Sequence, residues 1–251
     1  MREAASTVCL LHGFLGDPTE WNAVISECAQ LEPRATNPPT SANFQPLPLP
    51  PPSDWDAAIA TLDQQLADKC VLVGYSMGGR LALGCVMSNP TKYSGLVLLS
   101  ANPGLRGETE RRARADSDQQ LAKRLLREPL TKFLTDWYEQ PLFATATVDM
   151  RQRWVEERRS LDRDYQAGLV SQLSVGRQPD FWPRLPDLKL PTLFIVGEHD
   201  AKYAAIAAEA HRRNANFRVQ TIPNAGHAVH REAPACVSLH LIEFLAGVQT
   251  S

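Results

Sequence analysis

Five short apolar runs without polar–apolar alternation constrain the fold of this chain more than any other feature. They lie at 7–11, 70–75, 95–99, 192–197 and 217–222. Runs of this kind are typical of strands buried on both faces, as in a parallel sheet covered by helices. Helical patterns lie between several of them, at 21–31, 53–67, 79–88, 203–214 and 233–245. This alternation predicts an α/β fold with a mostly parallel central sheet and helices on both faces.

Two segments interrupt the alternation. Residues 37–52 contain seven prolines in sixteen positions. Because proline cannot donate to a strand ladder, we expect an irregular or edge-like connection there rather than a central strand; a proline-rich binding tract is the alternative. Residues 102–185 show charged helical patterns and no convincing strand. We therefore predict a helical lid at 102–185, inserted between two parts of one core at 1–101 and 186–251.

Composition and charge exclude several classes of protein. The 251 residues carry 26 Lys and Arg against 28 Asp and Glu, and the net charge of −2 does not favour binding to nucleic acid or an anionic membrane. No apolar run reaches the roughly 18 residues of a membrane helix, and no secretory signal pattern is present. The five widely spaced cysteines favour buried thiols over disulfides. We expect a cytoplasmic protein, for which a monomer is compatible with the sequence.

The segment Gly74-Tyr75-Ser76-Met77-Gly78 matches the pattern G-x-S-x-G. An apolar run precedes it and a helix-compatible stretch follows it. This is the context of a nucleophile elbow, a tight strand-to-helix turn that raises a serine above the sheet. A glycine-rich turn with an incidental serine is the alternative, but the context favours Ser76 as a reactive residue.

Two further residues lie at strand ends in the order that a Ser–Asp–His triad needs. Asp200 and His227 each follow one of the predicted strands. In such a triad His227 takes the proton of Ser76, while Asp200 orients the imidazole and stabilises its charged form. Glu198 and His199 are neighbouring competitors for the acid and base roles.

The loop after the first predicted strand reads HGFLG at 12–16. In folds with a nucleophile elbow this loop supplies one N–H donor of an oxyanion hole, and the residue after the nucleophile supplies the other. The predicted donors are the N–H groups of Phe14 and Met77, which would stabilise negative charge on an enolate or a tetrahedral intermediate. A plain turn is the alternative for this loop.

Arginine is concentrated near the predicted site. Arg80 lies four residues after Ser76, and residues 102–185 hold 15 of the 26 basic residues. Because arginine binds carboxylates through paired hydrogen bonds, a small substrate with several carboxylates fits better than the apolar acyl chain of a lipase. For most single arginines an exposed helix face or a structural ion pair is the alternative. The lid candidates are Arg106, Arg111, Arg112, Arg114, Arg158 and Arg159.

Six pieces of the chain together carry a resemblance to one family, namely LHGFLGDPTEW (11–21), GYSMGGRLAL (74–83), NPGLRGETERRARADSD (102–118), EPLTKFLTDWYEQPLF (128–143), GEHDAKY (197–203) and AGHAVHRE (225–232). They resemble the 2-succinyl-6-hydroxy-2,4-cyclohexadiene-1-carboxylate synthases, lyases of menaquinone and phylloquinone biosynthesis with the α/β-hydrolase fold. The motifs span nearly the whole chain, and those in the predicted lid are the most specific. The chain departs from the family at 47–52, which reads LPLPPP where relatives often read LPGHG, and in having at most minimal strands before the first core strand.

The resemblance implies a reaction and roles for individual residues. The family expels pyruvate from a cyclohexene that carries carboxylates. Ser76 would act as the base that removes a proton next to the succinyl carbonyl, and the enolate would bind in the predicted oxyanion hole. The positions that match the family's substrate-binding residues are Arg80, Arg114, Arg158, Tyr75 and Trp137.

Two other function classes stay open. A hydrolase of small acidic esters, thioesters or C–C bonds would use Ser76 as a covalent nucleophile, and a catalytically silent receptor would bind a ligand without turnover. No cofactor is expected, since the sequence has no P-loop and no dinucleotide-binding GxGxxG. No metal site is expected either, because His227 and His230 lack nearby ligands. His230 and Arg231 either orient the His227 loop or face solvent.

Overall fold

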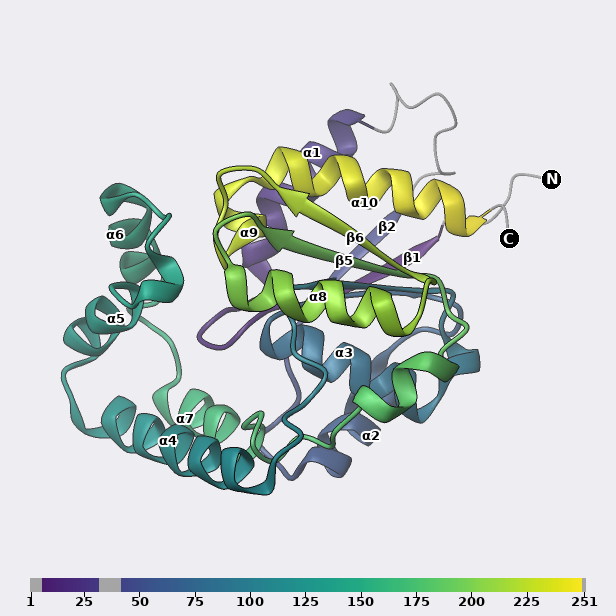
Figure 1. Cartoon of the computed structure of the whole chain (residues 1–251). Coiled ribbons are helices and arrows are strands. Elements are labelled where there is room, and N and C mark those ends of the chain that lie inside the picture. The colour runs from purple at the N-terminus through teal and green to yellow at the C-terminus, as the bar shows by residue number, and fades with distance from the viewer. Residues whose placement is uncertain (1–5, 32–41, 250–251) are drawn as a thin grey trace.

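One six-stranded parallel sheet forms the centre of the molecule (Figure 1). The computed structural model describes residues 6–31 and 42–249. The strand order is β2-β1-β3-β4-β5-β6. From β1 the chain first adds β2 on one side, and it then adds β3 and all later strands on the other side, so the strand order reverses between β1 and β3. Ligands of open α/β sheets bind at such a switch point, beyond the carboxyl ends of the strands. The strands are β1 (Thr7–Leu11), β2 (Asn43–Leu47), β3 (Val71–Tyr75), β4 (Gly95–Leu99), β5 (Thr192–Gly197) and β6 (Phe217–Ile222).

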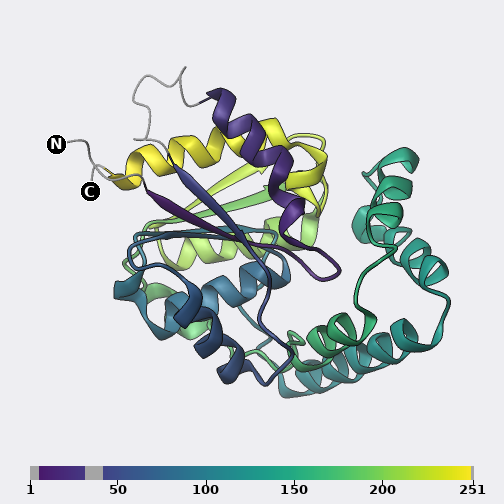
Figure 2. The same ribbon diagram turned by 180° about the vertical axis from the view of Figure 1, so that it is seen from behind.

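Helices cover both faces of the sheet, which confirms the predicted fold class (Figures 1 and 2). Side chains alternate between the two faces of a strand, so Val8 and Leu10 of β1 join the apolar cluster on one face, and Cys9 and Leu11 join the cluster on the other. Both faces are apolar, which is why the strands show no alternation in sequence. On one face lie α1 (Asn22–Leu31) and α10 (Pro234–Gln249); on the other lie α2 (Trp55–Gln65), α3 (Met77–Ser88) and α8 (Ala201–Arg213).

The described part of the proline-rich segment forms the edge strand β2, as expected from its prolines. β2 pairs in parallel with β1 alone, and Pro46 lies opposite Leu10 in the register. An edge strand tolerates proline because only one side of it belongs to a ladder. The first part of this segment, residues 37–41, lies outside the described residues.

Helix α3 begins two residues earlier than the sequence pattern predicts, at Met77 rather than Gly79. The reason is the backbone of Ser76, which has φ 49° and lets β3 turn directly into the helix. Among the described residues, short 3₁₀ helices and α9 (Val229–Glu232) form connections around the sheet, within the segment 102–185 and at the end of that segment. The 3₁₀ helices are η1 (Pro18–Trp21), η3 (Pro90–Lys92), η4 (Pro141–Phe143) and η5 (Trp182–Asp187).

Four helices in the segment 102–185 form an arc beside the sheet, seen in teal and green in Figure 1, and we call them the lid helices. Helix α4 packs along α7, and α5 packs against α6. Their shared apolar cluster, which we call the lid cluster, contains one buried residue from outside the segment, Leu15 of the loop after β1. The lid helices are α4 (Glu108–Arg127), α5 (Leu130–Tyr138), α6 (Val148–Glu157) and α7 (Arg163–Gln172).

Four of the five cysteines are buried, namely Cys9, Cys28, Cys70 and Cys85, and Cys236 is exposed. Within residues 6–31 and 42–249, no helix combines the length and the apolar character that crossing a membrane requires.

Candidate active site

Ser76 stands at the turn between β3 and α3, at the carboxyl edge of the sheet. Its backbone, with φ 49° and ψ −107°, lies outside the usual regions for a residue with a side chain. The Ser76 N–H donates to the Leu99 carbonyl at 2.9 Å, which fixes the turn to β4. The turn also needs glycine on both sides: a Cβ at Gly74 would come within 2.5 Å of the Gly78 oxygen, and a Cβ at Gly78 within 2.3 Å of the Leu11 oxygen. This is the geometry of a nucleophile elbow.

The structure brings Ser76, Asp200 and His227 together. His227 Nε2 lies 3.2 Å from Ser76 Oγ, and His227 Nδ1 lies 2.7 Å from Asp200 Oδ2. Asp200 and His227 are 6% and 2% exposed, so water competes little for these contacts. Glu198 and His199, the competitors for the acid and base roles, are both exposed, and Glu198 accepts a hydrogen bond from the Asn224 N–H. The arrangement fits a Ser–His–Asp triad, in which the histidine takes the serine proton.

Glu232 holds the loop that carries His227, a contact that the sequence analysis missed. Gly226 and Ala228 are the residues on either side of His227. Their N–H groups donate hydrogen bonds to the Glu232 carboxylate at 2.9 and 3.0 Å. It also accepts from the Thr145 hydroxyl at 2.6 Å, from a residue of the segment 102–185. Aromatic rings then enclose the imidazole, with the Tyr203 ring centre 4.6 Å away. The loop is therefore tied to both the core and the lid segment.

The loop after β1 places Phe14 on the wall of the same cavity as Met77. The Gly13 carbonyl accepts from His12 Nδ1 at 2.8 Å and from the Gly16 N–H at 3.1 Å. Burial lowers the pKa of His12, so at neutral pH it is uncharged and carries its proton on Nδ1. Met77 begins α3, where the first N–H groups of a helix have no acceptor within the helix. Both amides are thus placed near the elbow, and their role as an oxyanion hole stays a prediction.

A cavity of about 620 Å³ opens above Ser76 and His227, between the sheet edge and the lid helices. Tyr75 and Trp137, two of the predicted substrate-binding residues, line it. Trp137 also packs edge-on against Phe14, with ring centres 5.2 Å apart. Several cations face this space, namely Arg80, Arg114, Arg124, Lys202 and Arg231.

Arg80 is buried on the cavity wall, and its hydrogen-bond acceptors among the described residues are neutral. Its guanidinium donates to Gln178 Oε1 at 3.2 Å and to the Leu173 carbonyl at 2.8 Å. Burial, and then the charge of Arg114, lowers the pKa of Arg80 to about 10, so it remains charged at neutral pH. A buried cation without a carboxylate partner is costly unless an anion joins it. Arg80 is therefore prepared to bind a negatively charged group.

Arg114, in contrast, already has a carboxylate partner, Asp118. Its Nε donates to both carboxylate oxygens of Asp118, at 2.9 and 3.0 Å, and Asp118 also accepts from Ser174 Oγ at 2.6 Å. The Arg114 side chain is 43% exposed, while that of Asp118 is 6% exposed. Asp118 thus orients Arg114 from its buried side.

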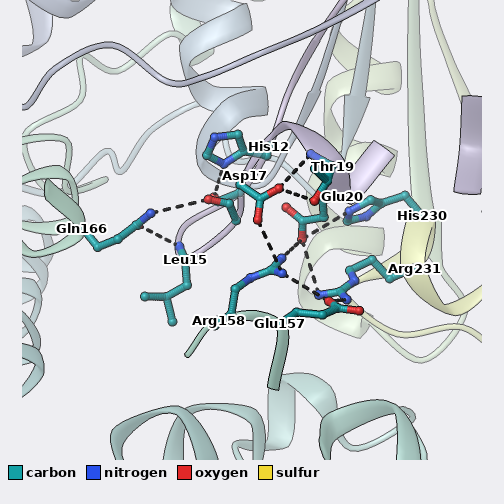
Figure 3. Close-up of polar contacts among 12 residues, drawn as sticks. His12, Leu15, Asp17, Thr19, Glu20, Glu157, Arg158, Gln166, His230 and Arg231 are labelled. Atoms are coloured by element: carbon teal, nitrogen blue, oxygen red, sulfur yellow. Dashed lines mark hydrogen bonds and ion pairs between the residues drawn. The ribbon is translucent and has the colours of Figure 1, made fainter. Parts of the chain in front are cut away.

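Arg158 is the one predicted substrate-binding residue that does not line the cavity. It is 3% exposed and lies among three carboxylates, at 3.4 Å from Glu20, 3.2 Å from Glu157 and 3.8 Å from Asp17 (Figure 3). Because these acids already match its charge, a substrate contact by Arg158 requires it to leave them. That contact stays a prediction.

Glu20 is the centre of this buried network, and the sequence analysis did not single it out. Its carboxylate faces Arg158, Arg231 and His230 (Figure 3). Burial alone would raise the pKa of Glu20, but His230, Arg158 and Arg231 lower it to about 2. His230 is fully buried and packs against the Tyr75 ring at 4.3 Å, so the solvent-facing alternative for His230 is wrong. The EW pair in the first family motif was the only sequence signal for Glu20.

Among residues 6–31 and 42–249, no group of three or more His, Cys, Asp or Glu side chains is placed to hold a metal ion. The cavity brings together a serine paired with a histidine, the backbone of Phe14 and Met77, and several cations.

Comparison with known proteins agrees with this site. The chain matches the Alpha/beta hydrolase family over residues 10–237 and belongs to that family. Two curated relatives are named 2-succinyl-6-hydroxy-2,4-cyclohexadiene-1-carboxylate synthase. The one from Enterobacter sp. (strain 638) is 36% identical, over 94% of this chain and 90% of its own. The one from Salmonella agona (strain SL483) is 35% identical, over 96% of this chain and 94% of its own. Within the α/β hydrolases, the chain belongs to the family of these synthases.

A solved structure supports the same relationship. The structure of MenH from S. aureus superimposes with a TM-score of 0.84 and 26% sequence identity, covering 98% of this chain and 96% of that one. The resemblance in sequence and the resemblance in fold therefore extend over nearly the same residues.

Proposed function

We propose that this protein eliminates pyruvate from 2-succinyl-5-enolpyruvyl-6-hydroxy-3-cyclohexene-1-carboxylate, giving 2-succinyl-6-hydroxy-2,4-cyclohexadiene-1-carboxylate. It would act as a cytoplasmic carbon–oxygen lyase of menaquinone or phylloquinone biosynthesis. The observation that carries the proposal is a Ser–His–Asp arrangement that shares its cavity with a buried arginine, Arg80, whose hydrogen-bond acceptors in the described part of the chain are neutral. The named relatives, similar over nearly the whole chain, support the choice of reaction.

In the proposed mechanism, Ser76 acts as a base rather than as an acylated nucleophile. His227 takes the hydroxyl proton across the 3.2 Å contact, and Asp200 stabilises the imidazolium. Ser76 Oγ then removes the proton next to the succinyl carbonyl, and the C–H electron pair forms an enolate. The amides of Phe14 and Met77 stabilise the enolate oxygen. When the enolate collapses, the C–O bond to the enolpyruvyl group breaks, the ring gains its second double bond, and the released enolpyruvate becomes pyruvate on taking a proton.

Recognition of the substrate would depend on its carboxylates. Arg80 is fixed beside the elbow by neutral acceptors, and Arg114 is oriented by Asp118. Charge-assisted hydrogen bonds from these guanidiniums to carboxylates are strong and directional. Tyr75 and Trp137 would bound the ring of the substrate. This chemistry needs no cofactor.

The second candidate is a hydrolase of small acidic esters, thioesters or C–C bonds. The same Ser76–His227 contact also fits attack by the serine on a carbonyl, followed by an acyl-enzyme. The two candidates differ in one observable: a hydrolase accumulates or passes through acylated Ser76, and the lyase does not.

The test is pyruvate release from the proposed substrate. Pyruvate is measured with lactate dehydrogenase while the absorbance of the conjugated diene is followed in parallel, with Ser76→Ala as the control. Release of pyruvate in step with diene formation, dependent on Ser76, supports the lyase. A substrate that is stable in the presence of folded wild-type protein rejects it, and small acidic esters and thioesters with mass spectrometry of Ser76 then test the hydrolase.

A further inference from the structure

The turn that carries Phe14 has an unusual backbone. The Gly16 N–H donates to the Gly13 carbonyl at 3.1 Å, which closes a four-residue turn, and Leu15 at its third position has φ 62°. Glycine or asparagine usually occupies such a position, because a Cβ is strained there. A leucine stays in this conformation only where its surroundings fix it.

The surroundings that fix Leu15 belong to the lid. Its side chain is 1% exposed and packs in the lid cluster. Its N–H donates to Oε1 of Gln166, on lid helix α7, at 3.0 Å. The same amide group reaches the neighbouring carbonyl, with Gln166 Nε2 at 3.5 Å from the Gly16 oxygen. Gln166 is 4% exposed, and Figure 3 shows it on one side of the loop, with the Arg158–Glu20 contacts on the other.

The Gly13–Gly16 turn also orients the Phe14 N–H. The Gly13 carbonyl and the Phe14 N–H belong to one planar trans peptide, so they point in opposite directions. Two donors fix that carbonyl, His12 Nδ1 at 2.8 Å and the Gly16 N–H at 3.1 Å. Gly16 keeps its place because Gln166 holds both Leu15 and Gly16. A continuous set of contacts therefore runs from α7 to the Phe14 amide.

We propose that Gln166 is a positioning residue for the oxyanion hole: its side-chain amide holds the Gly13–Gly16 turn so that the Phe14 N–H faces the oxygen that becomes negative. The role of the Phe14 amide rests on the function proposed above. Gln166 does not line the cavity, so it acts through the turn and not on the substrate.

The test compares Gln166→Met with a control on the same helix. Methionine keeps the length of the side chain and removes its hydrogen bonds. Ser171→Ala removes a buried contact of α7, the 2.8 Å bond to Gln119 Oε1, that lies within the lid. In the pyruvate assay we expect kcat of Gln166→Met to fall by about 10- to 100-fold with KM within about twofold, since a misplaced donor weakens only the transition state. Ser171→Ala should keep both constants.

Hydrogen exchange separates this proposal from the proposed function. In the free protein, the amides of residues 13–17 should exchange faster in Gln166→Met than in wild type. In Ser171→Ala their exchange rates should equal those of wild type. If wild-type protein releases no pyruvate, the function fails, while the exchange data still decide whether Gln166 holds the turn. Unchanged exchange in Gln166→Met, a kcat within twofold of wild type, or an effect on KM alone would each overturn the proposal. Gln166→Asn, whose amide is one methylene shorter, replaces Gln166→Met if the latter does not fold.

Discussion

Replacing Arg80 with methionine should separate stability from activity. Arg80 is 7% exposed, and burial followed by the charge of Arg114 lowers its pKa to about 10. Since one pKa unit corresponds to about 1.4 kcal/mol, this amounts to roughly 3 kcal/mol of unfavourable electrostatics in the folded state. The cost is present in full below pH 10, where Arg80 is charged both folded and unfolded, and it vanishes only at strongly alkaline pH. Methionine removes this cost.

The same substitution removes two hydrogen bonds from a charged donor, to Gln178 and to the Leu173 carbonyl. Each such bond contributes about 1.5–3 kcal/mol. The two bonds together contribute about 3–6 kcal/mol and the relieved cost is roughly 3 kcal/mol, so we expect the free energy of unfolding of Arg80→Met to lie within about 3 kcal/mol of wild type. Urea unfolding at pH 7.5, followed by tryptophan fluorescence, measures it.

Activity should respond very differently. Loss of one charge-assisted contact to a substrate carboxylate costs about 2–3 kcal/mol, which is a fall in kcat/KM of roughly 30- to 160-fold. Arg106→Met is the matched control, because Arg106 is 46% exposed, pairs with Glu209 and does not line the cavity; its kcat/KM should stay within about twofold of wild type. An Arg80→Met enzyme within threefold of wild type would remove Arg80 from substrate binding. A stability loss above about 4 kcal/mol would show instead that Arg80 is a structural residue.

Three further outcomes follow from the site. Arg114→Ala should lower kcat/KM by roughly 1.5–3 kcal/mol of transition-state binding, and a change below twofold in the pyruvate assay would exclude the contact. Asp200→Asn should slow turnover with little change in melting temperature, because it disturbs the histidine and not the core; full activity would return Glu198 as the candidate acid. Glu20→Gln should lose about 3 kcal/mol of stability at pH 7, because the folded-state pKa of Glu20 is about 2 against 4.5 for the free side chain. This difference is present above pH 4.5 and disappears as pH falls through 2, so equal urea midpoints for the two proteins at pH 7 would contradict it.

The proximity of Ser76, His227 and Asp200 could be predicted from sequence because each of these residues belongs to a local pattern. Ser76 lies in a glycine-framed turn, and Asp200 and His227 each follow an apolar strand. Residues that directly follow parallel strands all lie at the same edge of the sheet, whatever the details of packing. The strand assignments succeeded for a similar reason, since burial on both faces leaves a continuous apolar run.

The contacts that orient the site could not be predicted in this way. Gln166 meets Leu15 across 151 positions of sequence, and Thr145 meets Glu232 across 87. Nothing local distinguishes this glutamine from others on an exposed helix face. Arg158 shows the opposite difficulty. The resemblance to the family implies that it binds a substrate carboxylate, whereas the carboxylates beside it in the fold belong to the protein itself.

The position of Leu15 has a consequence for protein engineering. Because this residue belongs to the core segment of the chain but packs in the lid cluster, the lid is not a portable module. A chimaera that grafts the lid of a relative onto this core would join a foreign apolar surface to the native Leu15 side chain and leave the native turn without its partner on α7. A chimaera that exchanges the substrate preference should therefore be active only when residues 13–16 are also taken from the relative that supplies the lid.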